Sequence, residues 1–248
     1  RDGDLFVING QKTWSSNAHL AQYGFVLART DPTAPRHKGL TMFIVDNDAP
    51  GVTIRPLMNL AGDHYHNEAF YEEVRVPGER ILGQQNQGFY QLLKGLEADR
   101  FWGRFFKAPY CRRPLEDLVE YVRSTSRSGR PLSGDQSLRQ ELAQMAADIE
   151  VCRMLFFRTG CMLSDGLNPT FEASLGKLFA DEMGQRLYRL GMKILGPYGP
   201  LKEDSKWVQL RGTVQHLYQV SLGQTIAGGT SEIIRNTVAR MGLGLPKA

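Results

Sequence analysis

The sequence lacks the features by which several classes of protein are recognised. Its 248 residues include only three cysteines, and no two form a C-x-x-C pair, so neither a disulfide framework nor a cysteine-based metal site is expected. No apolar run approaches the roughly 20 residues needed to cross a bilayer, so no membrane span is expected. No basic and apolar leader opens the chain. We therefore expect reduced thiols and a cytoplasmic location, or the mitochondrial matrix if the source is eukaryotic.

The chain also has no large excess of positive or negative charge. Thirty basic and 26 acidic residues give a net charge of +4, and no run of five or six like charges occurs. A dispersed surplus of this size is typical of a solvated mixed surface, so no nucleic acid partner is expected. His64 and His66 would share one face of an extended segment, but no acidic or cysteine side chain completes a set of metal ligands. We predict no metal site.

Familiar catalytic motifs are also missing. The sequence has no G-x-G-x-x-G after a strand, no P-loop, no G-x-S-x-G and no H-E-x-x-H. It does have 42% hydrophobic and 23% charged residues, a globular composition sufficient for one large or two modest domains. Because the chain opens on Arg1 at the approach to a predicted strand, we expect a fragment of a longer protein.

Residues 4 to about 82 alternate short apolar runs with turn residues, which is the pattern of β-strands. Asn9-Gly10, which follows the apolar run at 5–8 and precedes a second predicted strand at 11–14, is the strongest short hairpin signal in the chain. Further strands are predicted at residues 23–28, 40–45, 52–57 and 69–76. This spacing predicts an antiparallel sheet or partial barrel, and we assign residues 1–83 to this β domain.

After Gly88 the apolar period becomes helical. Two stripes advance in steps of three and four residues, so each lines one side of a long helix. Their members are Leu138, Leu142, Met145, Ile149, Cys152 and Phe156, and then Leu175, Phe179, Met183, Leu187, Leu190 and Ile194. Pro109 and Pro114 are expected to break the first long helix, with Pro114 opening a second. We predict an antiparallel four-helix-type bundle over residues 84–248, and hence an α+β chain.

A glycine turn at Gly228-Gly229 precedes Thr230, Ser231 and Glu232, and Thr230 is expected to cap a last helix. The free N–H groups of such a helix start can bind an anion or a polarised carbonyl. An ordinary loop-to-helix junction would have the same sequence pattern, so the segment by itself leaves both interpretations open.

The segment at 96–100, Leu-Glu-Ala-Asp-Arg, places two carboxylates and an arginine within one helical turn. Four aromatic residues follow: Phe101, Trp102, Phe105 and Phe106. A carboxylate beside aromatic rings loses solvation, which raises its pKa and suits it to abstracting a proton. A charged surface cluster on an amphipathic helix is the alternative. Arg100 and Arg104 would share a helix face and could hold phosphate or pair with acids.

Several ordered stretches of this sequence resemble the acyl-CoA dehydrogenase family, from its middle β domain to its C-terminus. They are INGQKTWSSNA at 8–18, VRVP at 74–77, IAGGTSEIIR at 226–235 and VARMGLGLP at 238–246. The likeness spans nearly the whole chain, without the family's amino-terminal helical domain. It implies a flavin-dependent oxidoreductase of fatty acid or lipid metabolism. In such enzymes a carboxylate removes the α proton of an acyl-CoA thioester and the β hydride passes to N5 of FAD.

The resemblance also implies which residues contact FAD. Trp14 and Ser15 occupy positions beside the flavin, and Ser16 keeps the hydroxyl that would bond near N5. The helix-start segment matches the family's contact with the FAD phosphates, and one glutamine contact is retained. These further contacts are Gln136, Thr230, Ser231 and Glu232.

The commonest position of the family's catalytic glutamate is occupied here by Gly228, which has no carboxylate. An isovaleryl-type subgroup carries its base on the first bundle helix, and the matching position is Asp99. The resemblance therefore implies Asp99 as the base, with Glu97, Arg100 and Gly229 as substrate contacts. Arg100 would orient Asp99 or the substrate, and the Gly228 N–H would polarise the thioester carbonyl.

Other departures fall where the family completes FAD across a subunit interface. Thr125 and Ser128 stand in place of an arginine and a phenylalanine, and Arg127 is a candidate to replace the lost charge. Lys193 replaces a glutamine, and Pro197 interrupts a glycine-rich loop.

These departures leave three interpretations open. The first is a catalytic dehydrogenase subunit, and the second is a non-catalytic partner subunit of a heteromeric acyl-CoA dehydrogenase that contributes to a shared FAD site. The third is a helical scaffold without a ligand. The resemblance further implies a homo- or hetero-tetramer that acts on an acyl-CoA substrate, with an electron-transferring flavoprotein as acceptor. The acyl group itself is not identified by any residue of the chain.

Overall fold

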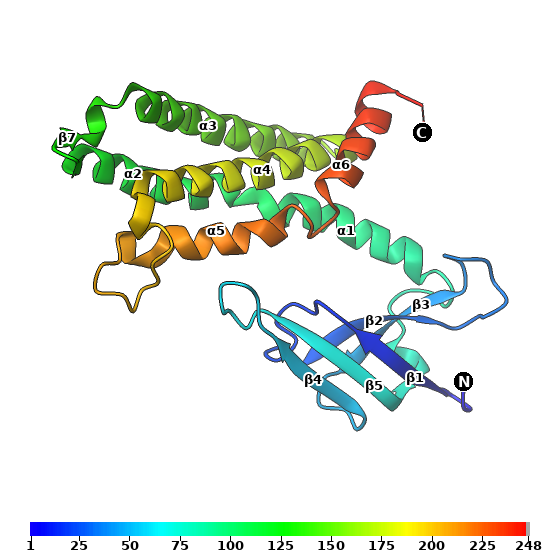
Figure 1. The fold of residues 1–248 in the computed structure, drawn as a ribbon. Coiled ribbons are helices and arrows are strands. Elements are labelled where there is room, and N and C mark those ends of the chain that lie inside the picture. The colour runs from blue at the N-terminus through cyan, green and yellow to red at the C-terminus, as the bar shows by residue number, and fades with distance from the viewer. Residues whose placement is uncertain (247–248) are drawn as a thin grey trace. The chain divides into compact units, whose positions relative to one another are not determined.

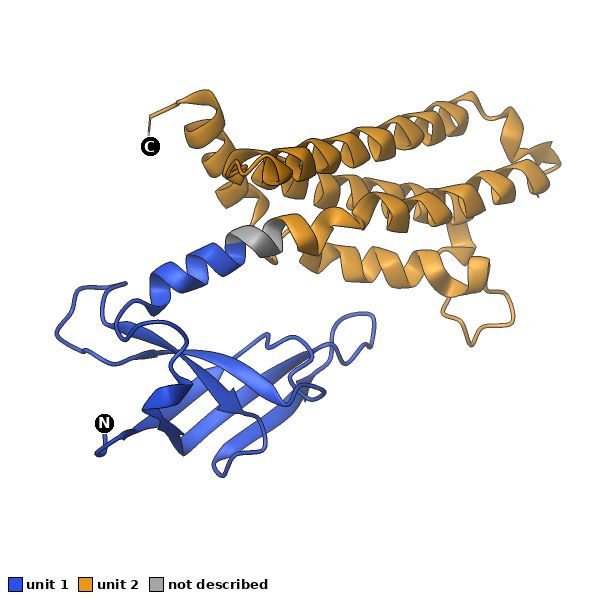
Figure 2. Ribbon diagram, turned by 180° about the vertical axis from the view of Figure 1, so that it is seen from behind, with its two compact units in different colours: residues 1–96 blue, residues 97–248 orange. Residues whose placement is uncertain are grey.

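The computed structural model describes residues 1–96 and 101–246. It divides into two compact units, residues 1–96 and residues 97–248, which are distinguished by colour in Figure 2. The first unit holds all the long strands, and the second holds most of the helices (Figure 1). Within the described residues, no helix is both long and apolar enough to cross a membrane.

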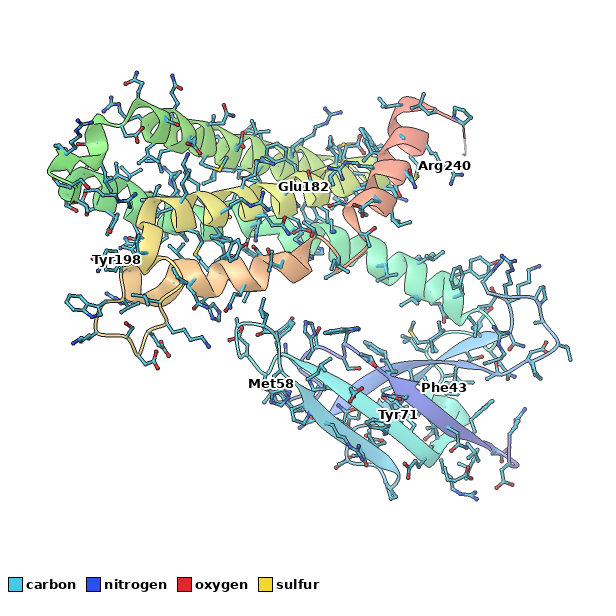
Figure 3. The ribbon with its side chains drawn as sticks, in the orientation of Figure 1. Phe43, Met58, Tyr71, Glu182, Tyr198 and Arg240 are labelled. Atoms are coloured by element: carbon cyan, nitrogen blue, oxygen red, sulfur yellow. The ribbon has the colours of Figure 1, made fainter. Side chains whose placement is uncertain are left out.

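Five antiparallel strands build the first unit, in a three-stranded sheet of order β1–β5–β4 and a two-stranded sheet of β2 and β3. Their bounds are β1 Leu5–Lys12, β2 Tyr23–Arg29, β3 Leu40–Asp46, β4 Val52–Leu57 and β5 His66–Pro77. Both sheets contribute apolar side chains to one core, in which Phe43 of β3 and Tyr71 of β5 are buried (Figure 3). Phe43 also packs on the ring of Phe6, with centroids 5.0 Å apart.

The expected hairpin at Asn9-Gly10 is wrong, because β1 runs straight through these residues and pairs with β5 along its whole length. The register changes between Ile8 and Gly10, where Asn9 alone faces two residues of β5. The Asn9 side chain accepts a bond from the Glu73 N–H at 2.8 Å and donates to the Glu73 carboxylate at 2.6 Å. The dipeptide thus marks a β-bulge, with Glu73 at a positive φ of 53°.

The bulge has a consequence for the core, because it resets which residues of β5 face inward. Ala69 and Tyr71 are buried before it, and Val74 and Val76 are buried after it. If the same sequence formed a regular ladder without the bulge, the alternation of the strand would turn the second pair of side chains toward solvent.

The second unit is a bundle in which α2, α3, α4 and α5 lie alongside one another (Figure 1). The bounds are α1 Gly88–Phe105, which begins in the first unit, α2 Lys107–Ser124, α3 Gln136–Ser164, α4 Thr170–Leu195, α5 Thr213–Gln224 and α6 Ser231–Thr237. A short hairpin of β6 Ser126–Arg127 and β7 Arg130–Pro131 joins α2 to α3. A π-helical turn, Val238–Gly242, extends α6.

The two predicted stripes form the interior of this bundle. Every member of the α3 stripe is buried, as are the last four of the α4 stripe. Three glycines of α4 make room for side chains of its neighbours. A Cβ at Gly176 would lie 3.4 Å from Phe156 of α3, one at Gly184 2.7 Å from Lys107 of α2, and one at Gly191 2.7 Å from Val214 of α5.

The helix break was expected at the prolines, but it occurs at Phe106, whose ψ of 4° is not helical. Pro109 lies in the first turn of α2, where its missing N–H has no helical acceptor. Its ring would clash with the carbonyl of a helical residue four positions earlier, at Phe105, which is where α1 ends. Pro114 does not open a helix, because it lies inside α2.

Candidate functional site

In the sheet unit, the predicted flavin-side residues follow directly after β1. The backbones of Ser15 and Asn67 exchange hydrogen bonds of 2.9 and 3.1 Å, which fixes the segment against the start of β5. Trp14 has a positive φ of 64° and is 64% exposed, so its indole is available to a ligand. The hydroxyl of Ser15 is buried without a hydrogen-bond partner among the described residues.

Histidines surround the same segment. His66 lies 3.4 Å from the Ser16 hydroxyl through Nδ1, and its ring meets Trp14 edge-on with centroids 5.6 Å apart. The rings of His19 and His64 stack at 3.8 Å. Among the described residues no three His, Cys, Asp or Glu side chains are grouped to hold a metal ion.

In the helical unit, the glycine turn and its cap have the local structure that the sequence predicts. Gly228 and Gly229 have positive φ values of 69° and 102°, which glycine adopts without strain. Thr230 is the N-cap of α6, and its hydroxyl accepts a bond from the N–H of Ile233 at 3.3 Å. The exposed Glu232 carboxylate has a lowered pKa, because its own backbone N–H and the Thr230 hydroxyl bond to its charged form.

A polar cavity of about 420 Å³ opens beside this cap. The α4 helix supplies one wall and the start of α6 supplies the other, and the lining residues are Glu182, Gln185, Arg186, Arg189, Thr225, Ile226, Thr230, Ser231, Glu232 and Arg235. The Arg235 guanidinium forms an ion pair with the Glu182 carboxylate at 2.5 Å, so these two charges of the cavity wall compensate each other. The Ser231 side chain is only 6% exposed, and its hydroxyl has no hydrogen-bond partner among the described residues.

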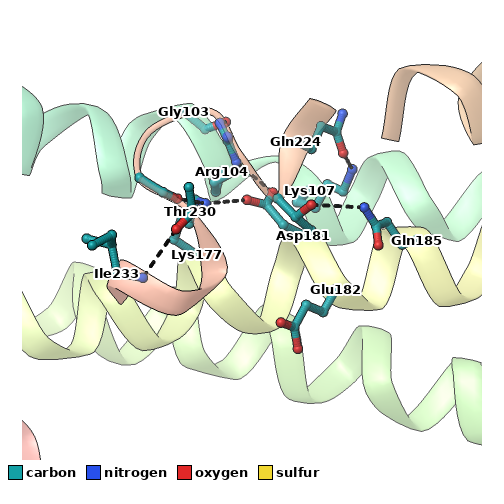
Figure 4. Close-up of polar contacts among 12 residues, drawn as sticks. Gly103, Arg104, Lys107, Lys177, Asp181, Glu182, Gln185, Gln224, Thr230 and Ile233 are labelled. Atoms are coloured by element: carbon teal, nitrogen blue, oxygen red, sulfur yellow. Dashed lines mark hydrogen bonds and ion pairs between the residues drawn. The ribbon is translucent and has the colours of Figure 1, made fainter. Parts of the chain in front are cut away.

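Behind the cavity lies a buried network of charges (Figure 4). The Asp181 carboxylate is fully buried between two cations, with Arg104 Nε at 2.8 Å and Lys177 Nζ at 3.1 Å. Lys177 is 1% exposed and also donates to the carbonyl oxygen of Gly229 at 2.6 Å. Lys107 donates to Gln224 nearby, and burial lowers the pKa of its ammonium. Of the two roles considered for Arg104, the structure therefore shows pairing with an acid.

Lys177 and Asp181 are not among the site residues that the sequence predicts. A signal for them was present, because a lysine and an aspartate four residues apart would share a helix face. Gly176, Ala180 and Gly184 flank the pair, and small residues beside charged ones on a long helix indicate a face covered by another element.

The predicted base and two predicted substrate contacts, Asp99, Glu97 and Arg100, lie outside the described residues. The aromatic residues that follow them are described, and they do form a cluster. Phe101 is buried against Phe105 with centroids 5.4 Å apart, whereas Trp102 is 61% exposed. These rings line an apolar cavity of about 460 Å³ together with residues of α3.

The residues that depart from the family pattern lie at one end of the bundle, around the β6–β7 hairpin and the end of α4. Arg127 donates to the carbonyl of Ile194 at 2.5 Å, and Lys193 is paired with Glu141 at 2.6 Å. Gln136 is the exposed first residue of α3, directly after the Asp135 cap. The Arg127 guanidinium is thus already bonded to the C-terminal end of α4.

All three cysteines are free thiols, as predicted. Burial raises the pKa of Cys111 and raises that of Cys152 to about 12, so neither is a nucleophile near neutral pH. These two thiols belong to the packing of α2 against α3.

Comparison with known proteins adds two family matches. Residues 1–73 match the acyl-CoA dehydrogenase middle domain, and residues 86–243 match the acyl-CoA dehydrogenase C-terminal domain. A curated relative, the acyl-CoA dehydrogenase IpdE1 of Mycobacterium tuberculosis, is 32% identical over 246 residues, which is 99% of this chain and 61% of the relative. The chain thus spans about three fifths of the length of such relatives.

Solved structures also resemble this chain over its whole length. A structure titled "Tcur3481-Tcur3483 steroid ACAD" superposes with a TM-score of 0.92 at 31% identity, covering 100% of this chain and 63% of that one. The ChsE4–ChsE5 complex of Mycobacterium tuberculosis superposes with a TM-score of 0.88 at 31% identity, covering 100% of this chain and 64% of that one.

Proposed function

Because the chain belongs to the acyl-CoA dehydrogenase family, we propose that it takes part in the flavin-dependent α,β-dehydrogenation of an acyl-CoA thioester. The matches to both domains confirm the predicted family and its α+β fold, and they support the predicted class of oxidoreductase and FAD as the cofactor. The observation that carries the proposal for this chain is the polar cavity beside α6, with the buried hydroxyl of Ser231, which has no partner in the described part of the chain, in its wall.

The residues of the cavity fit part of FAD. A phosphate oxygen is an acceptor, and the cavity offers the hydroxyl donor of Ser231 and guanidinium donors from Arg189 and from Arg186, which also bonds to Asp148 at 2.9 Å. An unpartnered buried hydroxyl costs free energy, and an acceptor on a ligand would remove that cost. In the sheet unit, the exposed indole of Trp14 and the hydroxyl of Ser16 fit an aromatic ring system with polar edges.

When bound, FAD supplies an acceptor for the hydride that leaves the β carbon. The protein supplies the base, and we assign this role to Asp99, with Arg100 orienting the carboxylate or the substrate. Glu97 and Gly229 contact the substrate, and the Gly228 N–H donates to the thioester carbonyl, which acidifies the α carbon. Gln136 is assigned to the cofactor, and an electron-transferring flavoprotein to its reoxidation.

A spectroscopic experiment tests this assignment. The chain is loaded with FAD, and acyl-CoA thioesters with straight, branched and steroid acyl groups are added without oxygen. The steroid group is included because one similar structure carries that word in its title. We expect loss of the flavin absorbance with at least one of these thioesters.

The base is tested with Asp99→Asn, and Asp204→Asn, the same change at an exposed loop position without an assigned role, serves as the matched control. Asp99→Asn is expected to keep FAD bound but to abolish bleaching, because an amide cannot accept the α proton. Normal bleaching in Asp99→Asn would eliminate Asp99 as the base while leaving the family assignment intact.

The second candidate function is a partner subunit that shares FAD with an unlike chain. Two observations favour it. The Arg127 guanidinium, the candidate to replace the lost interface charge, is bonded within the chain to the Ile194 carbonyl. Both similar structures carry two component names in their titles. A chain of this kind would be colourless when purified alone and yellow when co-expressed with its partner in a heterotetramer. A yellow protein from the single chain, as the only species in the tetramer, would contradict it.

A further inference from the structure

The buried charge network contains more positive than negative charge among the described residues. Arg104, Lys107 and Lys177 gather around a single carboxylate, Asp181, and both ends of the Lys177–Asp181 pair are at most 1% exposed. Burying an ammonium is expensive, and an apolar side chain of similar size would avoid this cost. The position of Lys177 therefore calls for a role beyond packing α4 against its neighbours.

The ammonium of Lys177 holds one backbone atom of the glycine turn. It donates to the carbonyl oxygen of Gly229 at 2.6 Å while Asp181 fixes it from the other side (Figure 4). Backbone bonds also close the turn locally, from the Ser231 N–H to the Thr225 carbonyl and from the Ala227 N–H to the Gly223 carbonyl, both at 3.0 Å. With two glycines in succession, a backbone without this anchor would sample several conformations.

The bond from Lys177 to the Gly229 carbonyl also affects the Thr230 N–H, which lies at the other end of the same peptide unit. The chain has no cis peptide among its described residues, so the N–H of Thr230 points away from the Gly229 carbonyl and hence away from Lys177. A cation on a carbonyl polarises the amide and strengthens its N–H as a donor. Thr230 lines the polar cavity together with Ser231, whose hydroxyl finds no partner over residues 1–96 and 101–246.

We infer that Lys177 is a positioning residue for the polar cavity: held by Asp181 and Arg104, it fixes and polarises the Gly229–Thr230 peptide for an anionic oxygen bound there. The inference rests on the proposed function in taking that oxygen to be a phosphate oxygen of FAD. Lys177 itself acts through the peptide and does not touch the ligand.

The experiment compares Lys177→Met with Leu187→Ala in the full 248-residue chain. Leu187 is a fully buried residue of α4, about 15 Å further along the helix, so its truncation destabilises the same helix without touching the turn. Amide hydrogen exchange is measured by mass spectrometry on peptides that cover residues 226–236, without FAD. We expect exchange at residues 228–234 to rise roughly tenfold in Lys177→Met and to stay within about twofold in Leu187→Ala. Equal increases in the two variants, or no increase in Lys177→Met, would overturn the inference.

A second readout is FAD affinity, measured by quenching of flavin fluorescence. We expect Lys177→Met to weaken binding about tenfold and Leu187→Ala to change it by less than about threefold. Equal affinity of Lys177→Met and the wild type would contradict the polarising role. If the wild type alone binds no FAD, the proposed role as a self-contained catalytic subunit fails, while the exchange measurement still decides whether Lys177 holds the turn.

Lys177→Gln covers the case in which Lys177→Met does not fold. Glutamine is one bond shorter and keeps a neutral donor, so it removes the charge but not all of the hydrogen bonding. The same changes in exchange and in FAD affinity are expected, at a smaller size than in Lys177→Met. Wild-type values for both measurements would count against the inference.

Discussion

Among the described residues, the buried polar side chains of the sheet unit are Thr41 and Asn67, both neutral, whereas the helical unit buries four charged ones: Lys107, Asp148, Lys177 and Asp181. The side-chain amide of Asn67 finds its hydrogen-bond partners within the same unit: the Ser15 carbonyl, His64 and His19. The helical unit instead joins its charges across three helices and a loop. A sheet of hydrogen-bonded strands positions a loop by backbone pairing, while a helical bundle has to use side chains for the same purpose.

The largest expected effect is in the helical unit. Asp181→Ala leaves Lys177 and Arg104 buried without their counter-charge, so the free energy of unfolding of this unit should fall by about 3–5 kcal/mol. The control is Asp204→Ala, at an exposed loop position, which should change it by less than about 0.5 kcal/mol. Calorimetry on both variants would measure the difference, and similar values for the two would show that the buried charges do not support the bundle.

The sheet unit should respond to lost volume rather than to lost charge. Val74 of β5 is fully buried directly after the bulge, and Val74→Ala removes two methyl-sized groups and leaves a cavity. We expect the free energy of unfolding of this unit to fall by about 2–3 kcal/mol in a urea titration. Val7→Ala, on the partly exposed face of β1, should cost less than half as much. Equal losses of unfolding free energy in the two variants would mean that the bulge does not determine which side chains of β5 point into the core.

The bulge itself can be tested at Asn9. Asn9→Ala removes both bonds to Glu73, but the site is exposed, so we expect a loss of about 1 kcal/mol. Gln11→Ala is the matched control, because Gln11 makes one exposed side-chain bond, to Glu68 at 3.1 Å, in the regular part of the ladder. Equal effects in urea titrations would indicate that the Asn9 bonds are not special to the bulge.

The smallest expected effect is a dependence on pH. Burial lowers the pKa of Lys107 below its ordinary value of 10.5, so the unfolded chain binds more protons than the folded chain between the two pKa values. In that window the free energy of unfolding should rise with pH. Lys107→Met lacks this group, so the wild type should gain stability relative to the variant as the pH approaches 10.5. A difference that stays constant with pH would contradict the lowered pKa.

Sequence periodicity was sufficient for the strands and the helical stripes, because both are set by which side chains face a core. It failed at Asn9-Gly10, where the residue types of a tight turn occur in a bulge whose partner, Glu73, is 64 positions away. It also misplaced the break between α1 and α2, since the proline ring acts on a carbonyl four residues earlier. For the site, local pattern predicted the Thr230 cap. The spacing of Lys177 and Asp181 was visible in the sequence, but their network was not, because Arg104 comes from another helix and the Gly229 carbonyl from a loop.

The glycines of α4 have a consequence for how the molecule assembles. Gly176, Gly184 and Gly191 admit Phe156, Lys107 and Val214 from three neighbouring helices, and each glycine weakens the helix by about 0.5–1 kcal/mol relative to alanine. A free peptide with the sequence of α4 should therefore show little helix by circular dichroism. The α4 helix therefore forms only as the neighbouring helices pack against it. A mutation that slows the folding of one of these neighbours slows the formation of α4 as well.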